Sequence, residues 1–170
     1  MRFEIVHEFE IPLEAVELAV LSPDLVANLK TRLKNMEDVR QTEHRLERGV
    51  LERAWAYQAS VKVPVPVFAN KVVTREMLSW EERSTYTIQT HSAAWSVRPN
   101  VKAEWRKYFQ AEGKYRLEAA ARGKTRRTVE GELHLRVPIV QKVAERAILG
   151  EVRRMFDAEA DTLREMETLV

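Results

Sequence analysis

The C-terminal stretch GELHLRVPIVQKVAERAILGEVRRMFDAEADTLREMETLV, residues 131–170, changes its hydrophobic spacing at Pro138. Before this proline, positions 133, 135 and 137 are leucine or valine and the residues between them are polar, which is the period of a strand with one buried face. After it, apolar residues recur every three or four positions as far as Val170, and charged residues occupy the opposite face. The stretch therefore predicts one strand followed by one long amphipathic helix.

Shorter elements precede this pair. Alternate residues from Phe3 to Ile11 share the apolar face of a first strand, and two short helices follow, over 13–21 and from a Ser-Pro-Asp cap at 22–24 to about Leu33. Strand-like patterns then occupy residues 38–47, 51–63, 74–82, 84–92, 101–121 and 125–137. Prolines at 64 and 66 deny the backbone two hydrogen-bond donors, so the segment after the second of these strands is expected to be an irregular connection.

The order of these elements predicts the fold class. An antiparallel meander that is apolar on one face needs a cover, and the terminal helix is the only element long enough to supply one. Thirty helical residues would span about 45 Å. The sequence thus predicts an α+β fold over residues 1–170 as a single domain. A curved antiparallel sheet of about seven strands, in the order β-α-α-β6-α, wraps around the long C-terminal helix.

Composition excludes several classes of protein. The chain has 170 residues, a net charge of +2 and no cysteine, so a disulfide framework, a thiol nucleophile and a cysteine-based metal site are all excluded. The interspersed charges favour no polyanionic partner, and no recognition helix or zinc pattern indicates nucleic acid. Five glutamates within the first seventeen residues do not fit a signal peptide or membrane span, so a cytoplasmic protein is expected.

One segment carries a resemblance to known proteins. GKTRRTVEGELHLRVPIVQKVAERAI, residues 123–148, combines a turn, a strand and a Val-Pro entry into a helix, and VPVPVF at 63–68 and Trp80 support it. The chain resembles the START-like, helix-grip (SRPBCC) superfamily, nearest an uncharacterised bacterial START-like domain family and more distantly the PRELI-type lipid carriers. The resemblance implies a cavity between sheet and helix that binds a hydrophobic or amphipathic small molecule.

The residues expected to face this cavity are the candidate ligand site. Its walls would be Trp55, Tyr57, Trp105 and Tyr115 on the strands and Ile148, Val152 and Phe156 on the helix. His7 and Arg53 share the inner face, where an imidazole could bond a ligand or move a proton and a guanidinium could pair with an anion. The aromatic residues could equally fill a closed core, and the two polar residues could have internal partners.

Catalytic motifs are absent, since the chain has no Gly-rich phosphate loop, no GxSxG and no HExxH. The histidines at 44, 91 and 134 show no metal-ligand spacing, and no cofactor is expected. The leading hypothesis is non-enzymatic binding or transport of a hydrophobic or amphipathic small molecule, such as a lipid.

Two alternatives stay open. One is a cyclase or dehydratase acting on a polyketide-like or aromatic substrate, with His7 or Tyr57 in proton transfer, and the other is a regulatory protein-interaction module. The basic run at 122–127 could make transient contact with an anionic membrane, or it could be a solvated turn without a partner. The sequence does not fix the oligomeric state.

Overall fold

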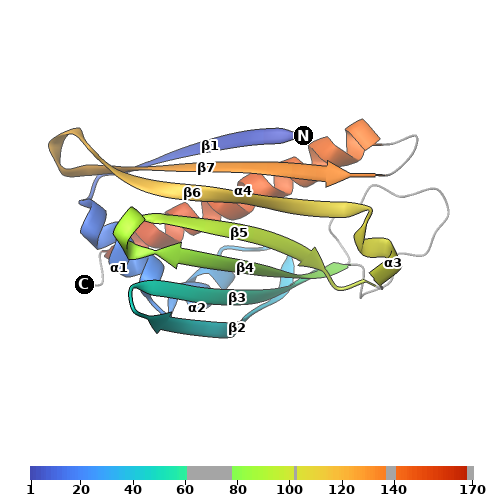
Figure 1. Ribbon diagram of the computed structural model, residues 1–170, viewed down its shortest axis with the longest axis horizontal. Coiled ribbons are helices and arrows are strands. Elements are labelled where there is room, and N and C mark those ends of the chain that lie inside the picture. Colours follow the sequence, from blue (N-terminus) through green and yellow to red (C-terminus); the bar gives the residue numbers. More distant parts are fainter. Residues whose placement is uncertain (61–77, 102, 137–140, 168–170) are drawn as a thin grey trace.

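This computed structural model of the protein describes residues 1–60, 78–101, 103–136 and 141–167 (Figure 1). Its strands are β1 (Arg2–Phe9), β2 (Met36–Glu47), β3 (Val50–Ala59), β4 (Ser79–Thr87), β5 (Ser92–Pro99), β6 (Phe109–Ala120) and β7 (Lys124–Leu135). Its helices are α1 (Leu13–Leu21), α2 (Leu25–Lys30), α3 (Ala103–Arg106) and α4 (Gln141–Glu167). None of these helices is long and apolar enough to cross a membrane.

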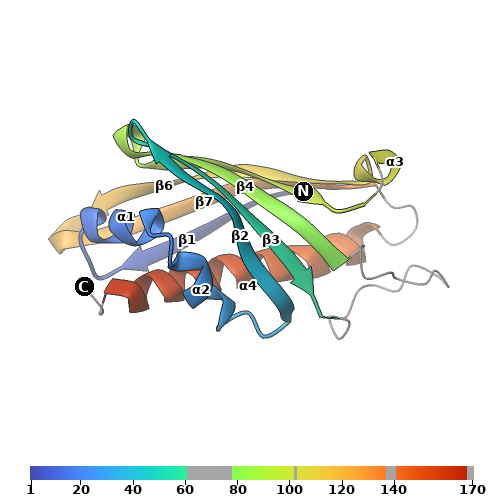
Figure 2. The same ribbon diagram turned by 90° about the horizontal axis from the view of Figure 1, so that it is seen from below.

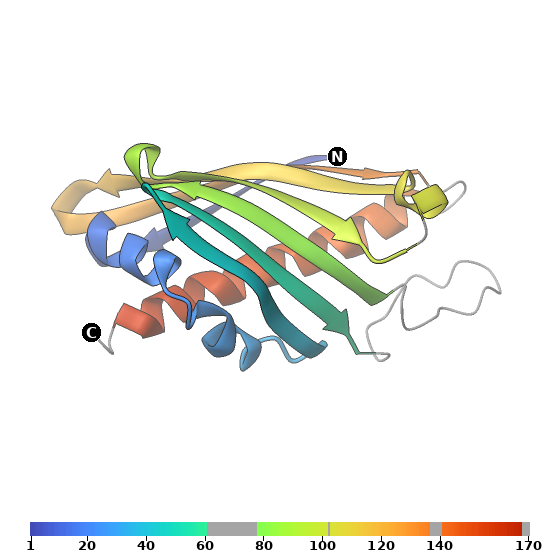
Figure 3. The ribbon, with the colours of Figure 1, turned by 60° about the horizontal axis from the view of Figure 1, so that its bottom comes forward.

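The strands form one antiparallel sheet in the order β1-β7-β6-β5-β4-β3-β2. The first strand therefore pairs with the last, and the terminal amine of Met1 donates to the carbonyl of Leu133 at 2.6 Å. The sheet is curved, and α4 crosses its concave face (Figures 2 and 3). This arrangement confirms the predicted α+β helix-grip fold with seven strands and a long C-terminal helix.

Helix α4 does not lie equally close to all strands. Its nearest backbone neighbours are α1 and α2 at one end and β1 and β7 along one side of the sheet. The central strands β3 to β6 reach α4 mainly through long side chains: the ring centroids of Trp95 and Phe156, for example, lie 5.5 Å apart. The concave face opposite β3 to β6 is therefore bridged by aromatic and charged side chains rather than by close backbone packing.

Two predicted strand boundaries are wrong. The break expected at residue 83 does not exist, because β4 continues to Thr87 and the chain reverses at Ile88–Thr90 and a left-handed His91 with φ 49°. The strand predicted over 84–92 is therefore wrong, and β5 occupies Ser92–Pro99, which was not predicted as strand beyond its first residue. Polar Glu82 and Ser84 face inward on β4, which hid its alternation. The expected strand over 101–121 begins only at Phe109, because residues 103–106 form α3, a helix too short to display its own period. Residues 61–63 and 74–77, also predicted as strand, lie outside the described residues.

Two paired glycines allow aromatic rings to pack on the strand backbone. Gly113 of β6 pairs with Gly131 of β7, and the rings of Trp95 and Phe3 lie over them on the inner face. A Cβ atom at Gly113 would stand 2.1 Å from the carbonyl oxygen of Glu130, and one at Gly131 would stand 2.3 Å from the Phe3 ring. Only glycine fits at either position without displacement of its neighbours.

Candidate functional site

Three charged residues form a buried ion cluster beneath α4. Glu159 of α4 accepts a hydrogen bond from Nη1 of Arg127 at 2.8 Å and a longer one from Nη2 of Arg53 at 3.4 Å. Arg127 is fully buried, and Arg53 and Glu159 are 5% and 6% exposed. Because Arg127 lies on β7 and Arg53 on β3, with three strands between them, the cluster ties the helix to both sides of the concave face.

The two guanidinium groups keep Glu159 ionised. Burial alone would raise the pKa of this carboxyl group, but Arg127 and Arg53 outweigh that effect and hold the pKa below its ordinary value. A buried carboxylate with two cationic partners is the arrangement in which burial of charge is tolerated. The cluster therefore contains two cations and one anion.

His7 is held inside by contacts at both ring nitrogens. Nη2 of Arg127 lies 3.3 Å from Nδ1, and since arginine only donates, Nδ1 accepts. Nε2 then carries the proton and donates to Asp157 at 2.7 Å. Burial and Arg127 lower the pKa of His7 despite the opposing effect of Asp157. These contacts favour a neutral imidazole that positions Arg127 over one that meets a ligand.

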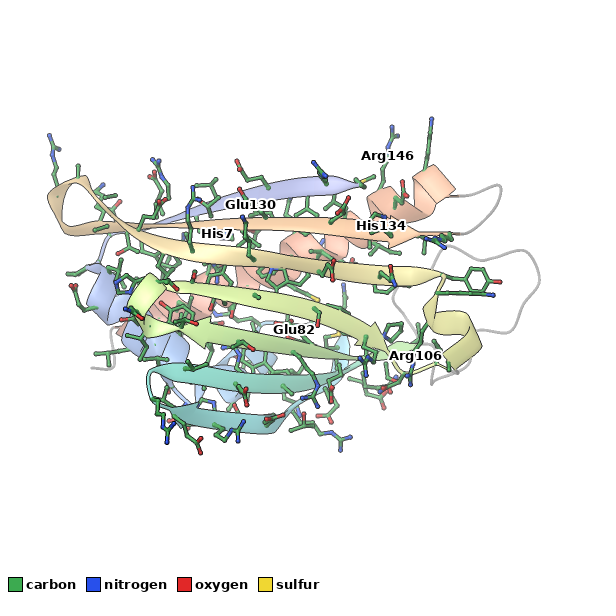
Figure 4. All side chains as sticks on the ribbon, viewed as in Figure 1. His7, Glu82, Arg106, Glu130, His134 and Arg146 are labelled. Atoms are coloured by element: carbon green, nitrogen blue, oxygen red, sulfur yellow. The ribbon has the colours of Figure 1, made fainter. Side chains whose placement is uncertain are left out.

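A second polar group lies on the central strands. The hydroxyl of Tyr57 on β3 donates to Oε2 of Glu82 on β4 at 3.3 Å, and the Tyr57 ring stacks on Trp80 with centroids 5.3 Å apart. Burial raises the pKa of Glu82 to about 7, although Arg53 opposes the shift. Figure 4 shows Glu82 and His7 rising from β4 and β1, which are not neighbouring strands.

Unpaired donors accompany this group. Nη1 of Arg53 and Nε1 of Trp55 are buried and have no hydrogen-bond partner among the described residues. The Arg53 guanidinium carbon lies 3.8 Å from the Trp55 ring centroid, so the two unpaired donors belong to side chains that are in contact with each other. Trp55 is directly paired with Glu82 across the two strands. We call Arg53, Trp55, Tyr57 and Glu82 the β3–β4 polar patch.

Two hollows that the described residues delimit lie on the other face of the sheet. Both are lined largely by outward-pointing side chains of β4 to β7, and they share Thr85, Ala94, Lys114 and Glu130. The larger hollow has a volume of about 1180 Å³ and is also lined by Arg2 and Glu132, near the ends of β1 and β7. Their walls are mostly charged or small, which differs from the aromatic inner face.

Comparisons with known proteins place the chain in a family. A family model described as "Protein of unknown function (DUF2505)" matches residues 4–166. The chain belongs to this family. A search of curated proteins found no match to this DUF2505 chain.

Solved structures share the fold at low sequence identity. The ZhuI aromatase/cyclase from a Streptomyces species has a TM-score of 0.64 and 12% identity, covering 99% of this chain and 93% of its own. A protein from Thermus thermophilus has a TM-score of 0.61 and 17% identity, covering 96% and 97%. Norcoclaurine synthase from Thalictrum flavum, in complex with dopamine and hydroxybenzaldehyde, has a TM-score of 0.60 and 12% identity, covering 97% and 88%.

The candidate wall residues of this DUF2505 protein are only partly brought together. Tyr115 is buried near the ion cluster, with the Arg127 guanidinium 5.7 Å from its ring, and Phe156 lies between Arg127 and Trp95. Ile148 packs against the core, and Val152 is partly buried on the same helix. Trp105 is on α3 rather than on a strand, and its side chain lies outside the described part of the chain.

Sequence reasoning missed three residues of the site. Arg127 alternates with Thr125 and Val129 along β7 and so faces inward, although it ends a run of basic residues. Glu159 falls in step with Phe156 and Leu163 on the apolar side of α4, and Glu82 alternates with Trp80 and Tyr86 on β4. The two-residue period of the strands and the 3.6-residue period of the helix predict an inward position for all three, provided that charged residues are accepted on the apolar face.

Proposed function

We propose that this protein binds a hydrophobic or amphipathic small molecule between the central strands and α4, without catalysing a reaction on it. The observation that carries the proposal is the buried guanidinium nitrogen Nη1 of Arg53, which has no acceptor among the described residues. A buried donor left unpaired costs about 1–3 kcal/mol, so a bound acceptor would recover a substantial stabilisation. The surrounding aromatic rings would supply the apolar contact area.

The fold supports this proposal without specifying a ligand. Structures of the same fold include a norcoclaurine synthase in complex with dopamine and hydroxybenzaldehyde and an aromatase/cyclase. At identities below 20% they show a shared scaffold only. The positions that would make a site here are those of this chain's own concave face.

Filling the concave face tests the proposal. Val97 of β5 is partly buried and pairs with Glu82, so Val97→Trp would place an indole in the proposed ligand space. We expect the wild type to bind one medium-chain amphiphile per chain in native mass spectrometry and Val97→Trp to bind at least tenfold more weakly. Val6→Trp, at a 49% exposed outer-face position, is the matched control and should bind like the wild type. Equal binding by both variants, or none by the wild type, would contradict the proposal.

A second candidate is acid–base catalysis on the same face. It is favoured by Glu82, whose pKa burial raises to about 7 and which accepts a hydrogen bond from Tyr57. A carboxyl group that titrates near neutral pH is suited to general acid–base catalysis. In this case Glu82→Gln and Tyr57→Phe would abolish turnover of an aromatic or polyketide-like substrate while its binding persists.

We place membrane contact, if the ligand is a lipid, away from the basic run at 122–127, whose basic residues other than Arg122 are paired or buried. Lys124 pairs with Glu10 at 2.8 Å, Arg126 pairs with Glu8 at 3.1 Å, and Arg127 is buried. Instead, several exposed cations lie on the elements at the end of the molecule that holds α3 and the start of α4, where Figure 4 labels Arg106 and Arg146. We call this group the basic end; it consists of Arg98, Arg106, Lys107, Arg136, Lys142 and Arg146.

A backbone hydrogen bond connects two strands at the basic end, and its positive charges are available to an anionic surface. The amide of Arg136 donates to the carbonyl of Tyr108 at 2.9 Å, which joins the end of β7 to the start of β6. Within the described part of the chain, these six side chains form no ion pair, whereas Arg2, Lys114 and Arg116 on the outer face all do. Each basic residue near an anionic membrane contributes about 1 kcal/mol.

Charge reversal tests this contact. We expect sedimentation with phosphatidylserine-containing vesicles, decreasing with added salt, and none with phosphatidylcholine alone. Replacing Arg106 and Arg146 with glutamate should remove at least about 2 kcal/mol, a roughly thirtyfold weakening. The control reverses Arg48 and Arg122 at turns of the opposite end, with the same change in net charge. Equal loss in both double variants would point to net charge alone and would overturn the assignment to the basic end.

A further inference from the structure

Arg53 is the less satisfied of the two buried arginines. Arg127 donates at 2.8 Å to Glu159, at 2.9 Å to the carbonyl of Phe156 and at 3.3 Å to His7. Among the described residues, Arg53 has one side-chain hydrogen bond, the 3.4 Å contact with Glu159, and its terminal nitrogen Nη1 is unpaired, whereas the unpaired nitrogen of Arg127 is Nε. A nearly fully buried guanidinium group with an unpaired N–H can donate a further hydrogen bond to an oxygen acceptor.

The charges around Arg53 favour an acceptor that is anionic. Two buried guanidinium groups share one buried carboxylate, that of Glu159, because Asp157 is engaged with His7 and its side chain is 54% exposed. Within the described ranges, Glu82 is the other carboxyl group that acts on Arg53. It accepts a hydrogen bond from the Tyr57 hydroxyl, and its raised pKa, about 7, weakens its balance of the second cation.

The donors fit one singly charged, planar group. Nη1 of Arg53 and Nε1 of Trp55 lie in one locality on β3, and each lacks an acceptor among the described residues. A carboxylate has two oxygens that could take one donor each. A phosphate dianion would place two negative charges beside the unpaired edge of Arg53 and the carboxyl group of Glu82.

We propose that the β3–β4 polar patch binds the carboxylate of an apolar carboxylic acid through Arg53 and Trp55, and that Glu82 takes up a proton when the carboxylate enters. This inference rests on the proposed small-molecule binding and names the class of its ligand. The groups that face Glu82 are Tyr57 and Arg53 from β3, Glu159 from α4 and Arg127 from β7. A ligand anion beside Arg53 adds a further negative charge, which favours the protonated form of Glu82.

A matched pair of probes isolates the head group. Decanoate and 1-decanol have the same chain length, and calorimetric titration gives the affinity of each. We expect decanoate to bind at least tenfold more tightly than decanol, and Arg53→Gln to abolish that preference. Trp55→Phe keeps an aromatic ring but removes the N–H, so it should weaken decanoate three- to tenfold and leave decanol unchanged. This second variant keeps the test decisive if Arg53→Gln fails to fold.

The proton uptake is tested through pH. Because the pKa of Glu82 is about 7, we expect the proton uptake that accompanies decanoate binding to be small at pH 6 and larger at pH 8. Because free decanoate stays ionised across this range, its affinity should fall up to tenfold from pH 6 to pH 8. Glu82→Gln should show the affinity of the wild type at pH 6 at every pH, and decanol binding should not depend on pH.

The outcomes separate the two proposals. Equal affinity for decanoate and decanol overturns the carboxylate inference and leaves small-molecule binding standing. Binding of neither probe overturns both. Preference for decanoate that survives both Arg53→Gln and Trp55→Phe would place the head group elsewhere and would also overturn the inference.

Discussion

Glu159→Gln is expected to lower the free energy of unfolding by about 3–5 kcal/mol, because it leaves two buried guanidinium groups without a carboxylate. The glutamine amide is nearly the same size, so packing changes little and the loss is electrostatic. Urea denaturation followed by circular dichroism measures the change. Glu165→Gln on the exposed side of α4, whose carboxylate pairs with Arg32, should cost no more than about 1 kcal/mol.

Two further measurements define the role of the cluster. Arg127→Met should cost less in the Glu159→Gln background than in the wild type, because the pair is already broken. The pKa of Glu159 is below its ordinary value in the folded protein, so its stabilisation is complete above the ordinary glutamate pKa and is lost as the pH falls through the folded-state pKa. Glu159→Gln should remove this acid-dependent part of the stability. A loss no larger than that of Glu165→Gln would show that the cluster contributes little.

Gly113→Ala is expected to cost about 3 kcal/mol or more, at the upper end of overpacking effects. The added methyl would meet the carbonyl oxygen of Glu130 at 2.1 Å and the Cα atom of Gly131 at 2.8 Å, and backbone atoms cannot rotate away as a side chain can. Thermal and urea unfolding would measure the loss. Gly150→Ala is the opposite control: nothing lies within 4 Å of its Cβ position on α4, so it should stabilise by about 0.5–1 kcal/mol. Equal effects of the two substitutions would contradict the close packing at Gly113.

The sequence predicts the fold well where hydrophobic period is strong. The change from strand to helix, which falls between Leu135 and Gln141, and the two short N-terminal helices agree with the structure. The number of strands also agrees, but β5 (Ser92–Pro99) stands in place of the strand predicted over 84–92. The boundary between β4 and β5 was wrong because inward-facing positions 82 and 84 are polar. Hydrophobic alternation identifies a strand only when its inward-facing residues are apolar, and here two of them carry a carboxyl group and a hydroxyl group.

The same limit explains the site. Arg53 was found because it alternates with Trp55 and Tyr57, but its partner Glu159 and the second arginine, Arg127, were not. Pairing between β3, β7 and α4 depends on how the sheet curves around the helix, which no local pattern encodes. The basic run at 122–127 also shows that charges adjacent in sequence need not form one basic patch. Strand alternation buries Arg127, while Lys124 and Arg126 pair with Glu10 and Glu8.

The position of the bound molecule is the central claim, and nuclear magnetic resonance of the ¹⁵N-labelled protein titrated with decanoate tests it most directly. The account predicts that the largest shifts occur at the indole N–H of Trp55 and at the amides around Arg53 and Glu82. Shifts concentrated instead at Ala94, Lys114 and Glu130, which line the outer-face hollows, would contradict it, as would an unchanged spectrum.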